Sequence, residues 1–113
     1  MNFIDFVLAN TSEYIETMPK ELRKKYGQFF TSKETAIFMA GLFDVSNIKS
    51  DLRILDPGAG SGILSVALIE RLEKIDSVKN INLVCYENDS NIQDLLSKNL
   101  SYVSQNSKKK YFL

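Results

Sequence analysis

The chain contains no histidine, and this absence excludes several kinds of chemistry at once. Without imidazole it cannot form a histidine-ligated zinc site or a serine–histidine hydrolase, and histidine-based acid–base catalysis is excluded as well. Cysteine occurs once, at Cys85, so a framework of internal disulfides is also excluded. A reducing cytoplasm is therefore the expected compartment, and Cys85 itself is expected to be a buried strand residue.

Long apolar runs and an excess of one charge are absent too. No apolar run approaches the ~20 residues of a membrane-spanning helix, and no signal peptide is visible at the N-terminus. Lysine and arginine number 14, as do aspartate and glutamate, so the formal net charge is +0. This balance favours neither a membrane nor a nucleic acid as a partner of the isolated chain. The 113 residues allow one domain at most.

The first third of the chain predicts helices. Residues 2–17 place apolar side chains near helical spacing, and we expect the helix to be weakened or interrupted at 10–12. Residues 19–25, PKELRKK, predict a short basic helical turn that begins at a proline. The aromatic stretch YGQFFTS, residues 26–32, contains a glycine and predicts a loop.

A further helix is expected over residues 33–44. Thr31 and Glu34 have the spacing of a capping box, and Ser32 is an alternative cap for the same helix. We expect this helix to bury the following residues: Ile37, Phe38, Ala40, Gly41 and Leu42.

The second half predicts a strand, a helix, a strand and a helix. The strands are expected at 52–55 and 81–87, and the helices at 61–75 and from Asp89 to about Tyr102. The expected buried positions of the two helices are Ile63, Val66, Ala67, Ile69, Leu72, Ile92, Leu95, Leu96 and Leu100. The fold class is therefore α/β, with one βαβ unit, a parallel strand pair and a right-handed crossover.

This order divides the chain into an N-terminal helical segment, residues 1–50, and a βαβ segment, residues 51–113. A third strand would begin at 111–113.

The stretch RILDPGAGSG, residues 53–62, has a strand before it and a helix after it, with glycines at Gly58, Gly60 and Gly62. Glycine lets the backbone approach a ligand closely and adopt positive φ. The start of the following helix presents free N–H groups and the positive end of the helix dipole. Together these features favour a ligand that carries a carboxylate or a phosphate.

Several explanations compete for this loop. A phosphate-binding P-loop needs a Gly-Lys pair that the sequence lacks, and a nicotinamide fingerprint needs one more residue before its third glycine. S-adenosylmethionine (SAM) carries an ammonium group and a carboxylate, so Asp56 suits its cation and the glycine amides suit the rest. Glu87 ends the second strand, where a carboxylate can accept both ribose hydroxyls. SAM is favoured, while a nicotinamide or flavin dinucleotide and a purely structural turn stay open.

These motifs resemble those of a known family. DPGAGSG and YENDS resemble the first and second motifs of adenine-specific DNA methyltransferases from restriction–modification systems, and YGQFFTS is similar to the family's G-x-[FY]-[FY]-T-P element. The nearest resemblance is to type I modification subunits and fused restriction–modification enzymes, although Ser32 stands where the usual proline would be. The resemblance implies a partial Rossmann-like SAM-dependent methyltransferase fold with an N-terminal helical extension.

The resemblance also implies which residues hold the cofactor. It places Phe30 and Thr31 near the methionine moiety, Asp56, Gly58 and Gly60 around it, and Glu87 on the ribose.

Three of these assignments keep a structural alternative. Phe30 can be a core aromatic, Thr31 only a helix cap, and Glu87 a solvated strand end.

The family's catalytic element, Asn-Pro-Pro followed by an aromatic residue, does not occur. The chain has two prolines, Pro19 and Pro57, and asparagine precedes neither. No catalytic residue is therefore predicted. We expect the SAM-binding N-terminal part of an adenine-specific DNA methyltransferase, a truncated gene product or expressed fragment that is inactive alone and meets DNA only within a complete enzyme. The alternative is a non-catalytic interaction module or a split-enzyme subunit. We expect a homo-oligomer or a complementing subunit.

Overall fold

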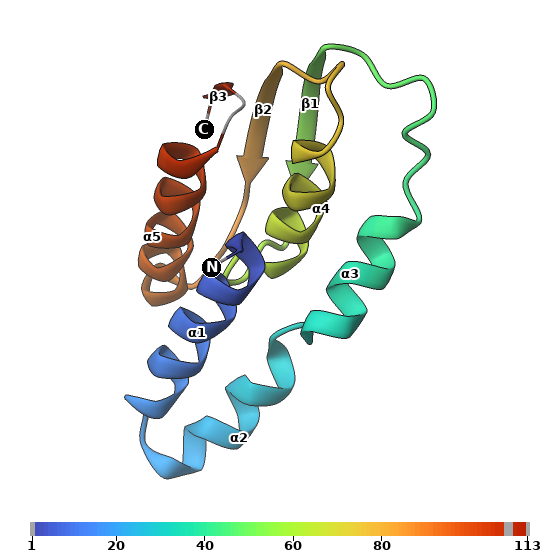
Figure 1. Cartoon of the computed structure of the whole chain (residues 1–113). Helices are drawn as coiled ribbons and strands as arrows, with labels where there is room; N and C mark the ends of the chain where they lie inside the picture. Colours follow the sequence, from blue (N-terminus) through green and yellow to red (C-terminus); the bar gives the residue numbers. More distant parts are fainter. Residues whose placement is uncertain (1, 108–109, 113) are drawn as a thin grey trace.

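The computed structural model describes residues 2–107 and 110–112, and the side chains of 25–29 and 110–112 are left undescribed. Five helices and three strands make up the described chain (Figure 1). In chain order they are α1 (Phe3–Glu16), α2 (Lys20–Phe29), α3 (Lys33–Gly41), β1 (Asp51–Asp56), α4 (Ile63–Glu73), β2 (Asn80–Cys85), α5 (Ser90–Asn106) and β3 (Lys110–Phe112). No helix in the described ranges is both long and apolar enough to cross a membrane.

The three strands form a parallel sheet in the order β1-β2-β3. β1 pairs with β2 from Asp51↔Asn80 to Asp56↔Cys85, and α4 connects the two strands. The expected βαβ unit is therefore present, and the α/β fold class is confirmed. β3 pairs with β2 through Asn80↔Lys110 and overlaps the third strand that was predicted to begin at 111–113; Leu113 lies outside the described residues. Among the described strands, β1 has a neighbour on one side only.

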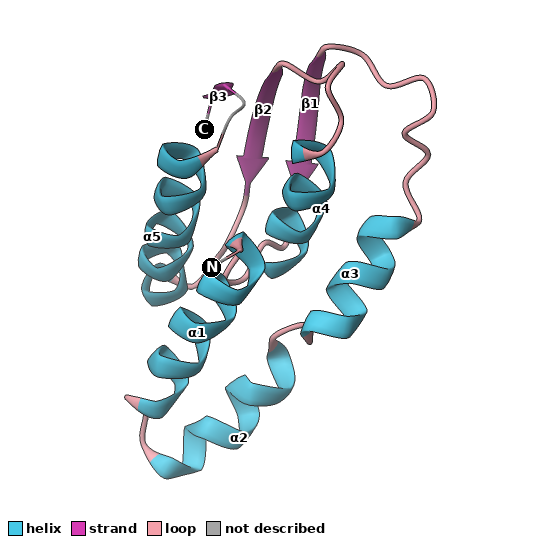
Figure 2. Ribbon diagram, viewed as in Figure 1, coloured by secondary structure: helices cyan, strands magenta, loops and turns pink. Residues whose placement is uncertain are grey.

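The core lies between the sheet and the helices that cover one of its faces (Figure 2). All nine positions predicted to be buried on the two helices of the βαβ segment are buried, and seven of the 11 residues of α4 are buried. α1 packs against α4 and α5, and its Ile4 and Val7 are almost completely buried. The helical segment is therefore part of the same core as the sheet.

α1 is continuous, so the interruption expected at 10–12 was wrong. Two of the three polar side chains that suggested it, those of Asn10 and Thr11, are hydrogen-bonded. The Thr11 hydroxyl donates to the Val7 carbonyl at 2.7 Å, within the helix. The Asn10 amide donates to the Asn99 side chain on α5 at 3.0 Å. Tertiary contact therefore outweighs the weak helix propensity of these residues.

Two further expectations about the helices were wrong. α2 continues to Phe29, so much of the predicted loop at 26–32 is helical; the single glycine inside it costs only ~1 kcal/mol relative to alanine and does not end a helix. α3 ends at Gly41 and leaves that residue exposed. α3 packs on α4 through its small residues, Ala36 and Ala40, so the burial predicted for Ala40 is confirmed. The larger residues predicted to be buried are exposed: Ile37, Phe38 and Leu42, the last of which caps the end of α3.

Candidate cofactor-binding site

A cavity of about 530 Å³ lies where the chain leaves the carboxyl ends of β1 and β2. Its volume falls within the range of small-molecule sites. The lining residues come from the glycine loop, the start of α4, the turn after β2, the start of α5 and the segment before α3: Phe30, Thr31, Pro57, Gly58, Ala59, Gly60, Ser61, Ile63, Leu64, Tyr86, Glu87, Asn88, Asp89 and Ile92. These residues include five of the six predicted binding residues, and Asp56 is the exception.

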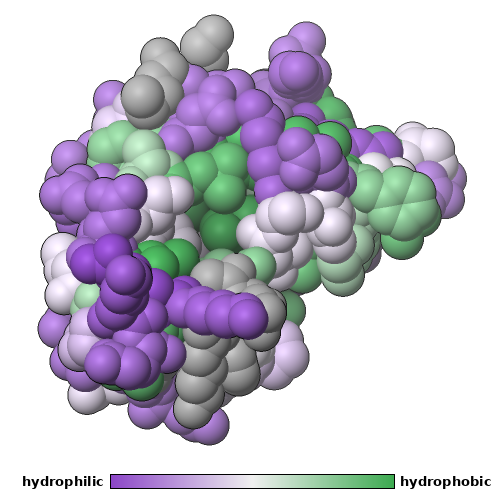
Figure 3. All heavy atoms as spheres, turned by 90° about the horizontal axis from the view of Figure 1, so that it is seen from below, coloured by the Kyte–Doolittle hydropathy of each residue, from purple (hydrophilic) through white to green (hydrophobic). Residues whose placement is uncertain are grey.

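The arrows of β1 and β2 in Figure 1 point toward the side of the molecule that Figure 3 shows face-on. Hydrophilic side chains cover most of that side in Figure 3, and hydrophobic side chains are visible in a depression near its centre. The carboxyl ends of parallel strands are the usual position for ligands in open α/β sheets.

The glycine loop adopts backbone conformations that favour glycine. Gly60 has φ +57° and Gly62 has φ +95°, and both values lie in the left-handed region. Gly62 precedes the first residue of α4 without a side-chain cap, so the free N–H groups of the first turn remain available to a ligand. The Ala59 amide donates to the Tyr86 carbonyl at 3.0 Å and joins the loop to the end of β2.

The Glu87 carboxylate connects the YENDS segment, to which it belongs, with the glycine loop of DPGAGSG. Its Oε1 accepts the Gly60 amide at 3.0 Å, and its Oε2 accepts the Asp89 amide at 3.0 Å. Asp89 in turn caps α5, because its Oδ1 accepts the Asn91 amide at 3.0 Å. Glu87 is therefore held in place by two backbone donors. A carboxylate has about four acceptor positions, so each oxygen can accept a further bond from a ligand.

Asp56 does not line the cavity, and its carboxylate bonds to α4 and to the start of the glycine loop instead. The Ser65 hydroxyl on α4 donates to Asp56 Oδ2 at 2.6 Å, and the Gly58 amide approaches Oδ1 at 3.4 Å. These bonds connect the end of β1 to α4 and the start of the loop. Cys85, the β2 residue paired with Asp56, approaches the Ser65 hydroxyl at 3.9 Å. Burial raises the pKa of the Cys85 thiol, and the Asp56 charge adds to that increase.

Thr31 lines the cavity, but it does not cap α3. That role belongs to Ser32, whose hydroxyl oxygen accepts the Thr35 amide at 3.3 Å. The predicted alternative cap is therefore the observed one, and Thr31 stays available to a ligand. Phe30 is partly buried against the core and lies 3.8 Å from the position that a Cβ on Gly60 would occupy. Its ring is thus both a core contact and part of the cavity wall.

Several lining residues were not predicted to be binding residues. Tyr86, Asn88 and Asp89 belong to the YENDS motif, and the rule that ligands lie beyond strand ends would have placed them here. Ile92 was predicted only as a buried helix position, and it also lines the cavity. The bond from Ser65 to Asp56 has no signal in the sequence, because it depends on how α4 packs against β1.

Comparisons with known proteins point to methyltransferases. The sequence model described as "Ribosomal RNA adenine dimethylase" matches residues 20–110. The type II methyltransferase M.PstI of Providencia stuartii is 37% identical over 71 residues, which are 63% of this chain and 13% of that protein. M.BsuBI, a type II methyltransferase of Bacillus subtilis, is 34% identical over 79 residues, 70% of this chain and 15% of that protein.

A third relative is the ribosomal RNA small subunit methyltransferase A of Fusobacterium nucleatum. It is 35% identical over 79 residues, 70% of this chain and 26% of that protein. The match therefore covers at most about a quarter of each of these three proteins. No solved structure matches this chain significantly.

Proposed function

The chain belongs to the ribosomal RNA adenine dimethylase family, a Rossmann-like family that uses SAM, and from this premise we propose that it binds SAM in the cavity beyond β1 and β2. We propose further that it is the cofactor-binding part of an adenine-specific DNA methyltransferase. One observation carries the binding proposal: a single cavity brings together the glycine loop, Glu87 and the segment before α3.

The groups around the cavity fit the chemistry of SAM. Glu87 offers carboxylate oxygens to the ribose hydroxyls, and its two bonds to backbone amides fix its position before a ligand arrives. The amides of the glycine loop and of the first turn of α4 suit the carboxylate of the methionine moiety. The side chains of Phe30 and Ile92 provide apolar surface for the uncharged parts. When bound, SAM would supply the methyl group.

Calorimetric titration with SAM and with S-adenosylhomocysteine tests the binding proposal. We expect dissociation constants on the order of micromolar to millimolar, because one open side of the cavity leaves the ligand partly solvated. Glu87→Ala should weaken binding roughly tenfold, since it removes the acceptors for two hydroxyls. Glu16→Ala, at the exposed end of α1, is the matched control and should bind like the wild type. Absence of binding at millimolar SAM would contradict the proposal.

Two observations support DNA as the nucleic acid of the complete enzyme. The YGQFFTS element resembles that of adenine-specific DNA methyltransferases, and two of the relatives are type II methyltransferases. The description of the matching family and the relative from Fusobacterium nucleatum favour ribosomal RNA as the second candidate. Either acceptor requires groups that receive the hydrogens of the adenine amine.

The chain alone should transfer no methyl group to either acceptor, because it has no Asn-Pro pair. Incubation of the purified chain with tritiated SAM and either adenine-containing DNA or ribosomal RNA should therefore leave the nucleic acid at blank level. Transfer above blank would show that catalytic groups lie elsewhere in the chain, and the labelled nucleic acid would identify the acceptor. The alternative, a binding module or a subunit that pairs with a chain carrying the catalytic half, predicts activity only after that chain is added.

A further inference from the structure

A buried pair of asparagines connects α1 to the glycine loop. Asn99, on α5, is completely buried, and its Nδ2 donates to the backbone carbonyl of Ser61 at 2.9 Å. The Nδ2 of Asn10, on α1, donates to Asn99 Oδ1 at 3.0 Å. The two bonds span 89 and 38 residues of sequence, so they join three distant segments of the chain.

The available donors and acceptors fix the direction of both hydrogen bonds. A backbone carbonyl can only accept, so the Asn99 amide must present its NH₂ group to Ser61. The Asn99 oxygen then faces Asn10, which must donate. Asn10 is partly exposed, whereas Asn99 has no contact with solvent. Asn10 therefore supplies a hydrogen-bond donor to a buried oxygen, and it holds the Asn99 amide in the orientation that the loop needs.

The Ser61 carbonyl is well placed to control the cavity. It lies between Gly60, whose amide donates to Glu87 at 3.0 Å, and Gly62, the residue that precedes α4. α5 also contacts the loop sterically, because a Cβ on Gly62 would lie 3.0 Å from Leu96 Cδ1. A shift of the Ser61 carbonyl would therefore change the backbone that lines the cavity and the bond that positions Glu87.

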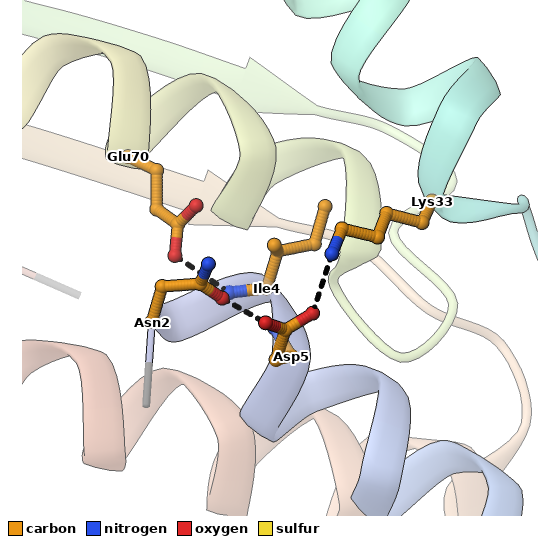
Figure 4. Close-up of polar contacts among 5 residues, drawn as sticks. All are labelled: Asn2, Ile4, Asp5, Lys33 and Glu70. Carbon is orange, nitrogen blue, oxygen red and sulfur yellow. Dashed lines mark hydrogen bonds and ion pairs between the residues drawn. The ribbon is translucent and has the colours of Figure 1, made fainter.

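α1 is itself anchored to the rest of the fold (Figure 4). The Ile4 amide donates to Glu70 Oε1 on α4 at 2.8 Å, so a side chain from another helix satisfies a free amide of the first turn. Asp5 pairs with Lys33 Nζ at 2.8 Å, at the start of α3. The match to the family model begins at residue 20, after the end of α1. α1 thus lies outside the matched region, and contacts with residues inside that region define its position.

We propose that α1 is a positioning element of the cofactor cavity, and that it acts through Asn10 and Asn99 on the Ser61 carbonyl. This inference rests on the proposed binding of SAM in that cavity. Neither asparagine lines the cavity. Their effect on the ligand is indirect, through the conformation of residues 60–62.

The test combines Asn10→Ala with two independent measurements. The first is the backbone amide NMR resonances and hydrogen-exchange rates of Gly60 and Gly62 in the free protein. The second is the affinity for SAM by calorimetry. We expect the two amides to shift and to exchange several-fold faster, and the affinity to fall about fivefold, the factor expected for the loss of one net hydrogen bond. Asn99→Asp keeps the side-chain size but cannot donate when ionised, and it should have the larger effect.

Asn106→Ala is the matched control. Asn106 lies on α5, as Asn99 does, and it is exposed. Its side chain donates to the Tyr102 carbonyl of the same helix at 2.8 Å. This variant should leave the loop amides and the affinity for SAM unchanged. If it changes them as Asn10→Ala does, the effect is a general one of α5 and the proposal is overturned.

The remaining outcomes separate this proposal from the binding proposal. If the wild type binds no SAM, the proposed function fails, and the loop amides alone then decide whether α1 positions the loop. Unchanged loop amides and affinity in Asn10→Ala overturn the inference, even if the melting temperature falls, because the asparagine pair would then be purely structural. Asn10→Ala is expected to fold, because this side chain is only partly buried; Asn99→Asp carries the greater risk of unfolding.

Discussion

The two faces of the sheet differ sharply along a single strand. On β2, the side chains of Ile81 and Leu83 are 0% and 2% exposed, whereas the neighbouring Val84 is 41% exposed. Successive side chains of a strand point to opposite faces, so this alternation distinguishes a face covered by helices from an open one. Parallel sheets are normally covered on both faces. The open face therefore resembles the inner side of a larger layered structure.

The open face is apolar where it borders the cavity. Leu55 and Tyr86 are 63% and 61% exposed, and Val84 lies on the same face. The edge of β1 away from β2 has no partner among the described strands. α3 and the residues just after it expose further apolar side chains, of which Phe38 and Leu42 are each 69% exposed. The covered face therefore holds the buried core, whereas the open face and the region of α3 expose large apolar side chains.

Neighbouring substitutions on β2 should give the largest contrast. Leu83→Ala removes a buried side chain from the covered face and should lower the free energy of unfolding by about 2–5 kcal/mol. Val84→Ala, one residue later on the open face, should change it by no more than about 0.5 kcal/mol. Urea unfolding of the two variants measures both values. Equal losses would show that the open face is covered in solution.

The contrast between packed and open surroundings also distinguishes two glycines of the loop that follows β1. Gly62 faces α5 with φ +95°, and an added Cβ would lie 3.0 Å from Leu96 Cδ1. Gly62→Ala should therefore cost about 1–3 kcal/mol of unfolding free energy, from strain at positive φ and from crowding. Gly58 has open space within 4 Å of an added Cβ and no positive φ, so Gly58→Ala is the control and should be nearly neutral. Thermal unfolding distinguishes them; equal melting temperatures would contradict the close packing of α5 on the loop.

Most of the βαβ unit could be predicted, because its local signals agree with its tertiary environment. The helix predicted at 61–75 has a clear apolar stripe, β1 ends just before the glycine loop, and Asp89 caps α5. The cavity followed from this order, since the carboxyl ends of paired parallel strands meet at one edge. Local pattern and global fold point the same way here.

The failures at α1 and α3 depend mainly on tertiary contact. Asn10 and Thr11 look like helix breakers, yet one side chain bonds to α5 and the other to its own helix. α3 has apolar residues on more than one side, and only the face that meets α4 could be buried. The small side chains of Ala36 and Ala40 lie on that face and are buried there. A single helix cannot reveal which of its apolar sides meets a partner.

The open face should also support self-association. We expect a homodimer at tens of micromolar, with a mass by light scattering near twice the monomer's 12.8 kDa. Leu55→Lys places a charge on the open face, and it should weaken the association at least tenfold, or about 1.4 kcal/mol. Ser101→Lys, at an exposed position on α5, is the control and should leave the dimer intact. A monomer mass for the wild type would contradict this prediction.

The smallest expected effect concerns Cys85, which belongs to the covered side. Burial raises the pKa of its thiol, so the folded protein keeps it protonated at pH values where an exposed thiol begins to ionise. Because only the thiolate reacts, labelling by a thiol reagent at pH 8 should be at least about tenfold slower in the native protein than in urea.

The raised pKa of Cys85 also affects stability, because a raised pKa in an acidic group stabilises the folded state at low pH. That contribution is complete below the pKa of the unfolded thiol, about 8.5, and declines as the pH rises toward the folded value. Ser65→Ala removes a hydroxyl 3.9 Å from the sulfur, whose hydrogen bond lowers this pKa, and should slow labelling further. Native labelling as fast as in urea would show that the helices do not shield this end of the covered face.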